Sequence, residues 1–448
     1  MRQQFQAKRL PQHKGVAAWS DILGGRVSNP TLSQDEIADV TIIGGGFAGL
    51  SAARRLLQLD PCLRVVLLEA GVLAEGAAGR NSGFMIDLPH DLASDDYAGQ
   101  GVAQDLRMIG LNRQAIRFAQ EAVQDYKIDP NYADPVGKVN GAATAAGDAH
   151  NESYFNHLEV MGEASEKLDQ QAMYELTGSR HYLSGLYTPG TLMLQPGGYI
   201  RGLGDGLSER IAIHENSPVV SIEKTLSDWT VRTKSGSVST GKVILANNGH
   251  LESFGVAKGK LLQLFLYASM TKELDKEALE KLGGNSRWGI TPSDPMGTTM
   301  RRIDSAQGGN RIITRTCATV LPGMVPNDGH LKRTSKVHRK KFDERFPQLS
   351  GMEMAYTWAG HLCLSLNGVS VMRQVEEGVF AACVQNGLGT ARGTLSGIAA
   401  AELAMGETSD ITAFFADEVA PKKLPPEPFA TMGANTYLRW KEWRAGAE

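Results

Sequence analysis

Two short apolar runs with a helical segment between them stand near the start of the chain. Residues 40–43 read Val-Thr-Ile-Ile, and residues 63–68 read Leu-Arg-Val-Val-Leu-Leu. Runs of this length that are rich in Val, Ile and Leu are typical of strands buried on both faces of a parallel sheet. Residues 50–59 between them predict a helix. The order strand, helix, strand predicts the beginning of an α/β domain.

Hydrophobic periodicity predicts further elements along the chain. Apolar residues recur at helical spacing in 106–126, and 151–172 reads as one amphipathic helix. Residues 132–146 alternate small and apolar side chains like a strand, and 211–243 predicts a meander with a hairpin at 234–237. Three more segments predict antiparallel strands, namely 261–271, 297–304 and 310–316.

The two ends of the chain differ from the middle in composition. Residues 1–38 are polar with scattered Pro and Gly, which predicts an arm lying on the body of the protein. Residues 422–428 read Lys-Lys-Leu-Pro-Pro-Glu-Pro, which predicts an extended linker. Residues 431–445 predict a terminal helix with several aromatic side chains. We expect this helix to dock on its own body, with a neighbouring subunit as the alternative.

Three glycines and an acidic residue give the first βα turn its chemistry. Gly44, Gly46 and Gly49 follow the first strand with G-x-G-x-x-G spacing, and Glu69 ends the second strand. Gly44 permits a tight turn, Gly46 lets the backbone approach a pyrophosphate, and Gly49 lets the helix pack closely. The helix N-terminus attracts phosphate, and the Glu69 carboxylate can accept both ribose hydroxyls. The pattern predicts a dinucleotide site; a glycine-rich turn in an ordinary α/β domain is the alternative.

Bulk composition narrows the protein class. The chain has 448 residues, of which 42% are hydrophobic and 21% charged, with a net charge of −3. These values predict a globular protein of two or more domains and do not favour a nucleic-acid partner. The basic cluster at 332–341 is interpreted as a solvated helix face, with a docking patch as the alternative. The four cysteines lack C-x-x-C spacing, and no signal peptide or membrane span is evident, so we expect a cytoplasmic protein without a metal site.

The segment after Glu69 carries a resemblance to a known family. Residues 76–83 read Gly-Ala-Ala-Gly-Arg-Asn-Ser-Gly. They resemble the Gly-Ala-Ser-Gly-Arg-Asn-Gly-Gly segment of the FAD-dependent oxidases related to D-amino-acid oxidase, glycine oxidase and sarcosine oxidase, with the γ-glutamylputrescine oxidase branch most similar. The resemblance implies FAD, with this loop beneath the pyrophosphate and the flat isoalloxazine ring. Arg80 and Asn81 can donate to phosphate or flavin oxygens; a surface loop with an ordinary arginine is the alternative.

Two later blocks support the resemblance. Residues 379–397 predict a strand, a glycine turn and a helix, and residues 242–250 resemble the family's strand ending in an Ala-x-Asn-Gly turn. In the family, the N-terminus of that helix faces the flavin C2 carbonyl, and the residue at Val219 touches the adenine. The FAD-binding residues that we expect are Gly44, Gly46, Phe47, Ala48, Gly49, Glu69, Ala70, Ala78, Gly79, Arg80, Asn81, Ser82, Gly83, Val219, Ala246, Gly387, Leu388, Gly389 and Thr390.

The resemblance also implies an architecture. We expect an α/β fold with a Rossmann-like FAD-binding domain of the glutathione-reductase type and a discontinuous α+β substrate domain built on an antiparallel sheet. The predicted domains are the arm at 1–38, the FAD-binding domain at 39–129, 195–259 and 361–420, the substrate domain at 130–194 and 260–360, and the linker with the C-terminal helix at 421–448.

Missing motifs limit the reaction. A second G-x-G-x-x-G for a nicotinamide cofactor and a redox cysteine pair are both absent from the sequence. The electrons therefore come from the organic substrate, which the family implies is an amine. Hydride would pass from the carbon next to nitrogen to flavin N5, and water would hydrolyse the imine. Oxygen, yielding H2O2, is the expected acceptor. A quinone or partner protein as acceptor, and a non-catalytic FAD-binding subunit of an oxidase complex, are the alternatives.

Four residues are the candidates for the substrate site. They are Tyr267, Arg302, Trp358 and His361, with Met85 and His90 as weaker candidates. The resemblance places them near the flavin edge or the substrate cavity, where an arginine could pair with a carboxylate. Core packing is the alternative interpretation of Trp358 and His361, and solvent exposure is the alternative for Arg302.

Two departures from the sarcosine oxidase pattern change the expected chemistry. Met354 and Ala355 precede the Tyr-Thr pair where those members carry a flavin-linking cysteine, so we expect non-covalent FAD. Ala391 stands where those members carry a carboxylate-binding lysine. An extended amine is therefore a better candidate substrate than a small α-amino acid. The sequence leaves the oligomeric state open.

Overall fold

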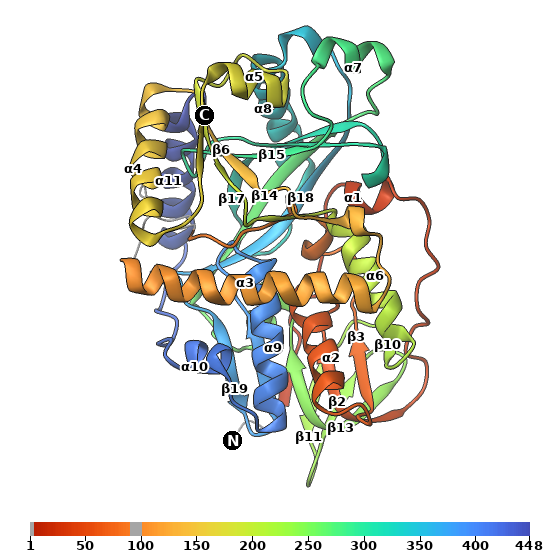
Figure 1. Ribbon diagram of the computed structural model, residues 1–448. Coiled ribbons are helices and arrows are strands. Elements are labelled where there is room, and N and C mark those ends of the chain that lie inside the picture. Colours follow the sequence, from red (N-terminus) through yellow and green to blue (C-terminus); the bar gives the residue numbers. More distant parts are fainter. Residues whose placement is uncertain (1–3, 90–100) are drawn as a thin grey trace.

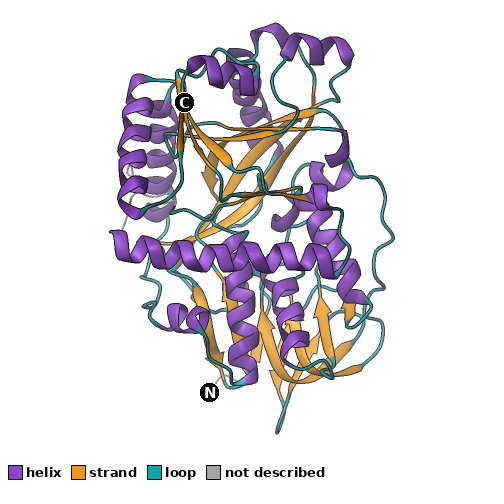
Figure 2. Ribbon diagram, viewed as in Figure 1, coloured by secondary structure: helices purple, strands orange, loops and turns teal. Residues whose placement is uncertain are grey.

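The computed structural model describes residues 4–89 and 101–448. Two β-sheets lie one above the other in the view of Figure 1, and the long helix α3 (Val102–Asp125) runs across the molecule between them. Figure 2 shows helices in front of the lower sheet and around the upper sheet. The mixed α/β architecture agrees with the predicted fold class.

The lower sheet contains the predicted nucleotide-binding strands. Its parallel strands, in spatial order, are β10 (Ala212–His214), β3 (Val65–Leu68), β2 (Glu36–Ile43), β13 (Ser237–Leu245) and β20 (Val379–Cys383). Its antiparallel strands are β12 (Trp229–Arg232), β11 (Ser221–Lys224), β1 (Gln4–Gln6) and β19 (Val371–Glu376).

Alternating side chains of the central strands enter two different hydrophobic clusters. Val65 and Leu67 of β3 pack with the helices, whereas Val66 and Leu68 of the same strand pack with the antiparallel meander. Both faces of these strands are therefore buried, as their apolar runs predict. The helical layer consists of α2 (Phe47–Leu59), α6 (Pro196–Ser208) and α9 (Ala391–Met405), with α3 across them and α10 (Asp410–Ala416) beside α9.

The upper sheet forms the second half of the protein. Its order is β18 (Met354–Ser365), β14 (Leu261–Thr271), β17 (Arg311–Val320), β16 (Thr299–Ile303), β15 (Trp288–Pro292), β6 (Lys138–Ala142), β8 (Ser184–Thr188) and β7 (Glu166–Leu168). Neighbouring strands are antiparallel except β15 and β6, which are parallel. The strands predicted from 261–271, 297–304 and 310–316 are confirmed as β14, β16 and β17. A third, small sheet has the order β4 (Phe84–Met85), β9 (Leu192–Leu194) and β5 (Ala133–Asp134).

Helices from distant parts of the chain cover the upper sheet. They are α4 (Ala145–Met161), α5 (Gln170–Thr177), α7 (Lys276–Leu282), α8 (Asp328–Arg345) and α11 (Phe429–Ala445), and the short α1 (Ala18–Asp21) contacts β18. The terminal helix α11 docks on its own body, as expected. Glu442 accepts a hydrogen bond from the amide of Ala318, and Asn435 accepts one from the amide of Val320, both at 2.9 Å. These side chains satisfy edge amides of β17 that its neighbour β16 does not reach.

The predicted helix at 151–172 is wrong. Helix α4 ends at Met161 because Gly162 adopts a left-handed conformation with φ of 72° and closes the helix. The chain then forms β7, and Asp169 caps a new helix, α5, by accepting from the amide of Ala172.

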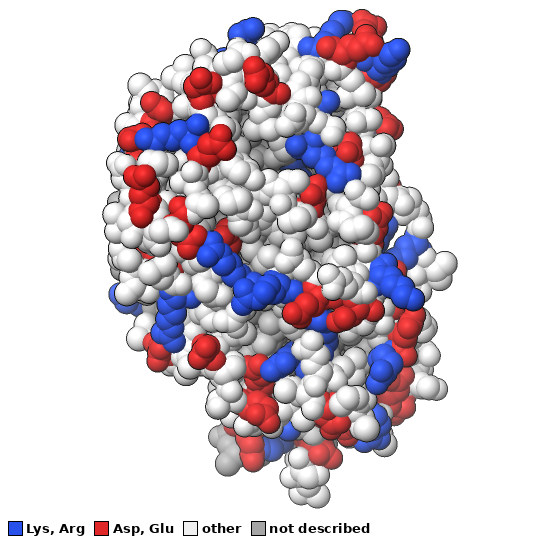
Figure 3. All heavy atoms as spheres, viewed as in Figure 1, with Lys and Arg blue, Asp and Glu red and all other residues white. Residues whose placement is uncertain are grey.

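No helix within the described residues is both long and apolar enough to cross a membrane. On the face drawn in Figure 3, basic and acidic side chains are intermingled over both halves.

Candidate active site

The glycine turn after β2 forms the first part of the site. Gly44 has φ of 108°, and a Cβ there would lie 2.7 Å from the carbonyl oxygen of Ala246. A Cβ on Gly49 would lie 3.0 Å from the carbonyl carbon of Gly44, so helix α2 packs directly on the turn. At Gly46, the N-cap of α2, the nearest atom to such a Cβ is 3.6 Å away, on Ala78. The backbone is thus open at the helix N-terminus, the position that holds the pyrophosphate in dinucleotide-binding folds.

Glu69 is fixed at the end of β3 by backbone amides. Its Oε2 accepts from the amide of Gly45 at 2.7 Å, and its Oε1 accepts from the amide of Gly71 at 2.9 Å. Burial raises the pKa of this carboxyl, and the nearby Glu215 carboxylate acts in the same direction. A carboxylate has about four acceptor positions, so two remain for ribose hydroxyls.

The loop at 76–83 is held by its own polar side chains. Arg80 donates to the carbonyl of Glu75 at 2.6 Å, and Asn81 donates to that of Ala78 at 2.5 Å. The Arg80 guanidinium also donates to the carbonyls of Lys14, Gly15 and Ala359, at 3.1, 2.9 and 3.3 Å. Burial lowers the pKa of Arg80 to about 10, opposed by Glu75. Both side chains therefore hold the shape of the loop, while Arg80 Nη2 and the second N–H of Asn81 Nδ2 have no part in these bonds.

Arg301 ties this loop to the upper sheet. It is buried on β16 and donates to the carbonyl of Ser82 at 3.1 Å and to the carbonyl of Leu194. Its guanidinium also lies over the ring of Trp19, 4.9 Å from the centroid. Burial lowers the pKa of Arg301 to about 9. The loop at 76–83 thus has a fixed position between the two halves.

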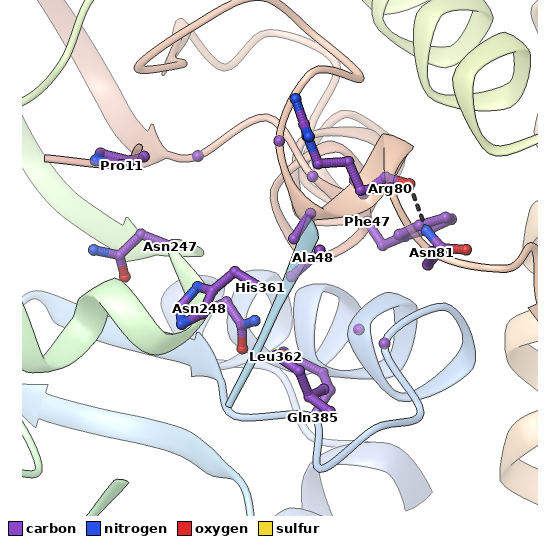
Figure 4. A pocket seen from close by; sticks show the side chains of 18 of the residues that line it. Pro11, Phe47, Ala48, Arg80, Asn81, Asn247, Asn248, His361, Leu362 and Gln385 are labelled. Atoms are coloured by element: carbon purple, nitrogen blue, oxygen red, sulfur yellow. Dashed lines mark hydrogen bonds between the residues drawn. The ribbon is translucent and has the colours of Figure 1, made fainter. Parts of the chain in front are cut away.

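One cavity of about 330 Å³ extends along these elements. Figure 4 shows side chains from the α2 turn, the 76–83 loop, β18 and the β20–α9 turn converging on it. Of the residues expected to bind FAD, those lining the cavity are Gly44, Gly46, Phe47, Ala48, Glu69, Ala70, Ala78, Arg80, Asn81, Ser82, Gly83, Val219, Ala246, Gly387, Leu388, Gly389 and Thr390. Gly49 and Gly79 lie behind it, where a Cβ would meet the backbone of Gly44 and of Ala74.

The turn before α9 closes one end of this cavity. Residues 387–390 line it, and the Thr390 hydroxyl donates to the carbonyl of Phe84 at 2.8 Å. Helix α9 begins at Ala391, so its partially positive N-terminal end is next to the cavity. Ala391 itself is buried and does not line the cavity. The cavity thus combines glycine turns, the N-termini of α2 and α9, and the Glu69 carboxylate at the end away from α9. This combination fits a dinucleotide with a flat ring.

The upper sheet supplies the opposite wall of the cavity. Because side chains alternate between the two faces of a strand, register decides which arginine faces the cavity. Thr299 of β16 lines the cavity, and Arg315 of β17, its partner in register, does so as well. Arg302 points to the other face, where it donates to the carbonyl of Gly283. The prediction of Arg302 as a substrate-binding residue is therefore wrong, and Arg315 takes its place in the cavity.

The other substrate-site candidates divide in the same way. Tyr267 and His361 line the cavity, whereas Trp358 does not. Trp358 is buried against Trp19 and donates from Nε1 to the carbonyl of Arg80 at 3.0 Å, so it supports the loop instead. Among the weaker candidates, Met85 is buried outside the cavity, and His90 lies outside the described residues.

Tyr267 and His361 are both held neutral. His361 Nε2 is 2.9 Å from Oε1 of Gln263, and the imidazole stacks on Phe265 with centroids 5.1 Å apart. Burial lowers the pKa of His361 to about 3, and the neighbouring His250 contributes. Burial also raises the pKa of Tyr267. Neither group carries charge near neutral pH.

Two groups of cavity residues were not anticipated from the sequence. Residues 9–13 of the arm line the cavity, and so do Asn247, Asn248 and His250 after β13. The second group directly follows the Ala246 turn, which offered a signal in the sequence. Within residues 9–13 of the arm we find no such signal.

Comparison with known proteins places these features in a family. The family described as DAO, FAD dependent oxidoreductase, matches residues 39–403. A probable oxidoreductase OrdL of Haemophilus influenzae is 26% identical over 402 residues, covering 86% of this chain and 87% of its own. Gamma-glutamylputrescine oxidoreductase of Escherichia coli is 26% identical over 427 residues, covering 91% and 93%. The crystal structure of glycine oxidase from Geobacillus kaustophilus superimposes with a TM-score of 0.68 at 16% identity, covering 86% of this chain and 100% of that one.

Proposed function

Since the chain belongs to the DAO family of FAD-dependent oxidoreductases and FAD is its cofactor, we propose that it oxidises an amine. The neutral amine loses a hydride from the carbon next to nitrogen and becomes an iminium ion, which water hydrolyses to a carbonyl compound and a protonated amine. FAD, when bound, supplies the acceptor for the hydride. Oxygen then accepts the two electrons and yields H2O2 in the leading form of this proposal.

One observation carries the proposal, namely that a single cavity touches both halves of the protein. Glu69 and Gly46 line it on the lower sheet, and Tyr267, Thr299 and Arg315 line it on the upper sheet. A small molecule against the upper wall would therefore share one cavity with the cofactor. Such proximity is the main requirement for hydride transfer.

The charges around the cavity favour a neutral amine as the reacting species. Among the described lining residues Glu69 is the one carboxylate, and it belongs to the nucleotide end. Arg315 and Arg80 are cationic, and His361 and Tyr267 are neutral. Nearby positive charge and low polarity both lower the pKa of a bound ammonium group. The amine would thus bind without its extra proton, and a neutral amine releases hydride without a separate base.

Arg315 supports a substrate that carries an anionic group as well as the amine. Its planar guanidinium suits a carboxylate. Residues 387–390, which line the cavity at the α9 turn, carry no charge, so a carboxylate attached directly to the reacting carbon lacks a partner there. The name of the Escherichia coli relative, gamma-glutamylputrescine oxidoreductase, supports an extended amine. We therefore propose an extended amine with an anionic group at a distance from the reacting carbon.

An anaerobic reduction screen tests the amine proposal. The holoenzyme is mixed with polyamines, N-methyl amino acids and γ-glutamyl amines, and the visible flavin band is recorded. We expect at least one amine to bleach the band. If none does while dithionite reduces the flavin fully, the protein is a non-catalytic FAD-binding subunit or acts on another class of compound. Peroxide formation on admission of air then separates an oxidase from a dehydrogenase that uses a quinone or partner protein.

Variants of Arg315 and Arg302 provide a matched test of whether the anionic group of the substrate binds at Arg315. Arg315→Ala should raise KM for the amine found in the screen by at least tenfold, or about 1.4 kcal/mol, and Arg315→Lys should recover part of it. Arg302→Ala changes an arginine on the opposite face of the same sheet and should leave KM within twofold. Equal effects of the two alanine variants would refute the assignment of Arg315.

A further inference from the structure

The N-terminal arm is fastened to both halves of the protein. On the lower sheet, β1 pairs with β11, and the hydroxyl of Ser253 bonds both the amide and the carbonyl of Arg9, at 2.8 Å each. On the upper sheet, the carbonyl of Lys14 accepts from the amide of Ala359 on β18 at 3.0 Å. The arm therefore spans from one sheet to the other within the few residues between Arg9 and Lys14.

That spanning segment lies against the cavity. Residues 9–13 line it, together with the α2 turn and the β20–α9 turn. A Cβ on Gly76 would lie 3.9 Å from the His13 ring, so His13 is next to the start of the 76–83 loop. In the same loop Ala78 faces the N-terminus of α2 at Gly46. His13 is thus next to the middle portion of the cavity, between its nucleotide end and its upper wall.

The arm and the 76–83 loop are interlocked. Two of the hydrogen bonds from Arg80 go to the arm carbonyls of Lys14 and Gly15. In return, Trp19 of the arm donates from Nε1 to the carbonyl of Asn81 at 2.8 Å and is fully buried. Movement of the arm would therefore disturb the loop that borders the cofactor.

We propose that residues 9–15 form part of the FAD site as a strap, and that FAD leaves only when this strap detaches from β18 and Arg80. His13 is the strap residue in contact with the cofactor, opposite the Gly76–Ala78 segment. The strap is held by backbone groups of Arg9 and Lys14, by the Arg9 guanidinium on the carbonyl of Pro322 and by the ion pair of Lys14 with Asp328 at 2.8 Å. These contacts can break without unfolding either sheet. Because linkage is reciprocal, bound FAD also holds the strap in place.

Two glycines of the arm offer a matched test. Gly15 and Gly24 have φ of 76° and 80°, so alanine introduces the same backbone strain at both. A Cβ at Gly15 would contact the carbonyl of Thr357 and lie 2.7 Å from Cα of Trp358, whereas one at Gly24 meets nothing within 4 Å. Gly15→Ala should therefore dislodge the strap, and Gly24→Ala should not.

FAD release is the measurement. Each holoprotein is diluted, and the rise of free-flavin fluorescence is followed at equal temperature and salt. Gly15→Ala should release FAD at least tenfold faster than the unaltered chain, and Gly24→Ala should stay within twofold. His13→Ala should raise the FAD dissociation constant several-fold, while His13→Gln, which retains a polar contact, should have a smaller effect. Equal release rates for the Gly15 and Gly24 variants would overturn the proposal.

Limited proteolysis of the unaltered chain gives a second readout that needs no variant. Lys8 and Arg9 are exposed to trypsin, and Lys14 follows them in the strap. FAD should slow cleavage after these residues at least tenfold relative to the chain stripped of FAD, while cleavage in the exposed 422–428 linker stays constant. Cleavage of the strap at the same rate with and without FAD would show that it does not enclose the cofactor.

Discussion

Replacing Glu69 by glutamine tests the nucleotide end of the site. Both carboxylate oxygens already accept backbone amides, from Gly45 at 2.7 Å and from Gly71 at 2.9 Å, and the remaining acceptor positions face the cavity that Glu69 lines. Hydrogen bonds to a charged group contribute about 1.5–3 kcal/mol, against about 0.5–1.5 for neutral pairs. Glutamine lacks the negative charge, so the hydrogen bonds from the two ribose hydroxyls should weaken by about 2–3 kcal/mol in total. The FAD dissociation constant should then rise roughly 30- to 150-fold.

The assay compares FAD with FMN, which lacks the adenosine ribose. Protein stripped of flavin is titrated with each compound, and binding is followed by quenching of flavin fluorescence. Glu69→Gln should weaken FAD and leave FMN within twofold, whereas the exposed Glu209→Gln should change neither. An equal loss for FAD and FMN would mean that the substitution damages the turn. An unchanged FAD affinity would refute the assignment of the ribose to Glu69.

Three further outcomes are expected. Acid precipitation should release the flavin into the supernatant, because Met354 and Ala355 offer no linking thiol; flavin that stays with the pellet would contradict this. Sarcosine and glycine should show a lower kcat/KM than an extended amine, because Ala391 provides no charge for a carboxylate beside the α9 turn; sarcosine as the fastest substrate tested would contradict it. Burial lowers the pKa of His338 from 6.5 to about 4. Below pH 6.5 the His338 imidazole binds a proton in the unfolded chain but not in the folded chain. The free energy of unfolding should therefore be unaffected by His338 above pH 6.5 and should fall by roughly 3 kcal/mol as the pH is lowered toward 4. Urea unfolding of His338→Gln should show less loss over this range than the unaltered chain, and identical pH profiles would refute the role of His338.

The βα turn that borders the cavity was predictable because its determinants are contiguous in the sequence. Two strands, a helix and three glycines within thirty residues specify the βα turn, and Gly44 and Gly49 occupy positions that exclude a Cβ. The small-residue loop at 76–83 is equally local. Each of these features is a backbone requirement, so it leaves a direct record in the residue types.

The upper wall was not predictable to the residue, because a strand alternates sides at every position. Arg301 and Arg302 are adjacent on β16, yet Arg301 reaches the flavin-side loop and Arg302 the opposite face. The alternation of apolar and polar residues usually shows which face of a strand is buried. On β16, however, both faces carry apolar side chains, since Met300 packs in one hydrophobic cluster and Ile303 in another. A strand buried on both sides carries no signal for which side holds the cavity.

The contribution of the arm left few traces in the sequence for a different reason. Its main contacts use backbone groups, such as the carbonyls of Lys14 and Gly15 that accept from Ala359 and Arg80. Every residue offers a carbonyl, so such contacts impose little selection on side-chain type, and the segment reads only as polar. The exceptions are informative. Gly15 is required by its positive φ and by the closeness of Trp358, and Trp19 is fully buried in an otherwise polar stretch. A glycine and a tryptophan that tie a polar segment to a cofactor loop are the features by which sequence reasoning could have recognised a strap, and they are the positions at which its role is most directly tested.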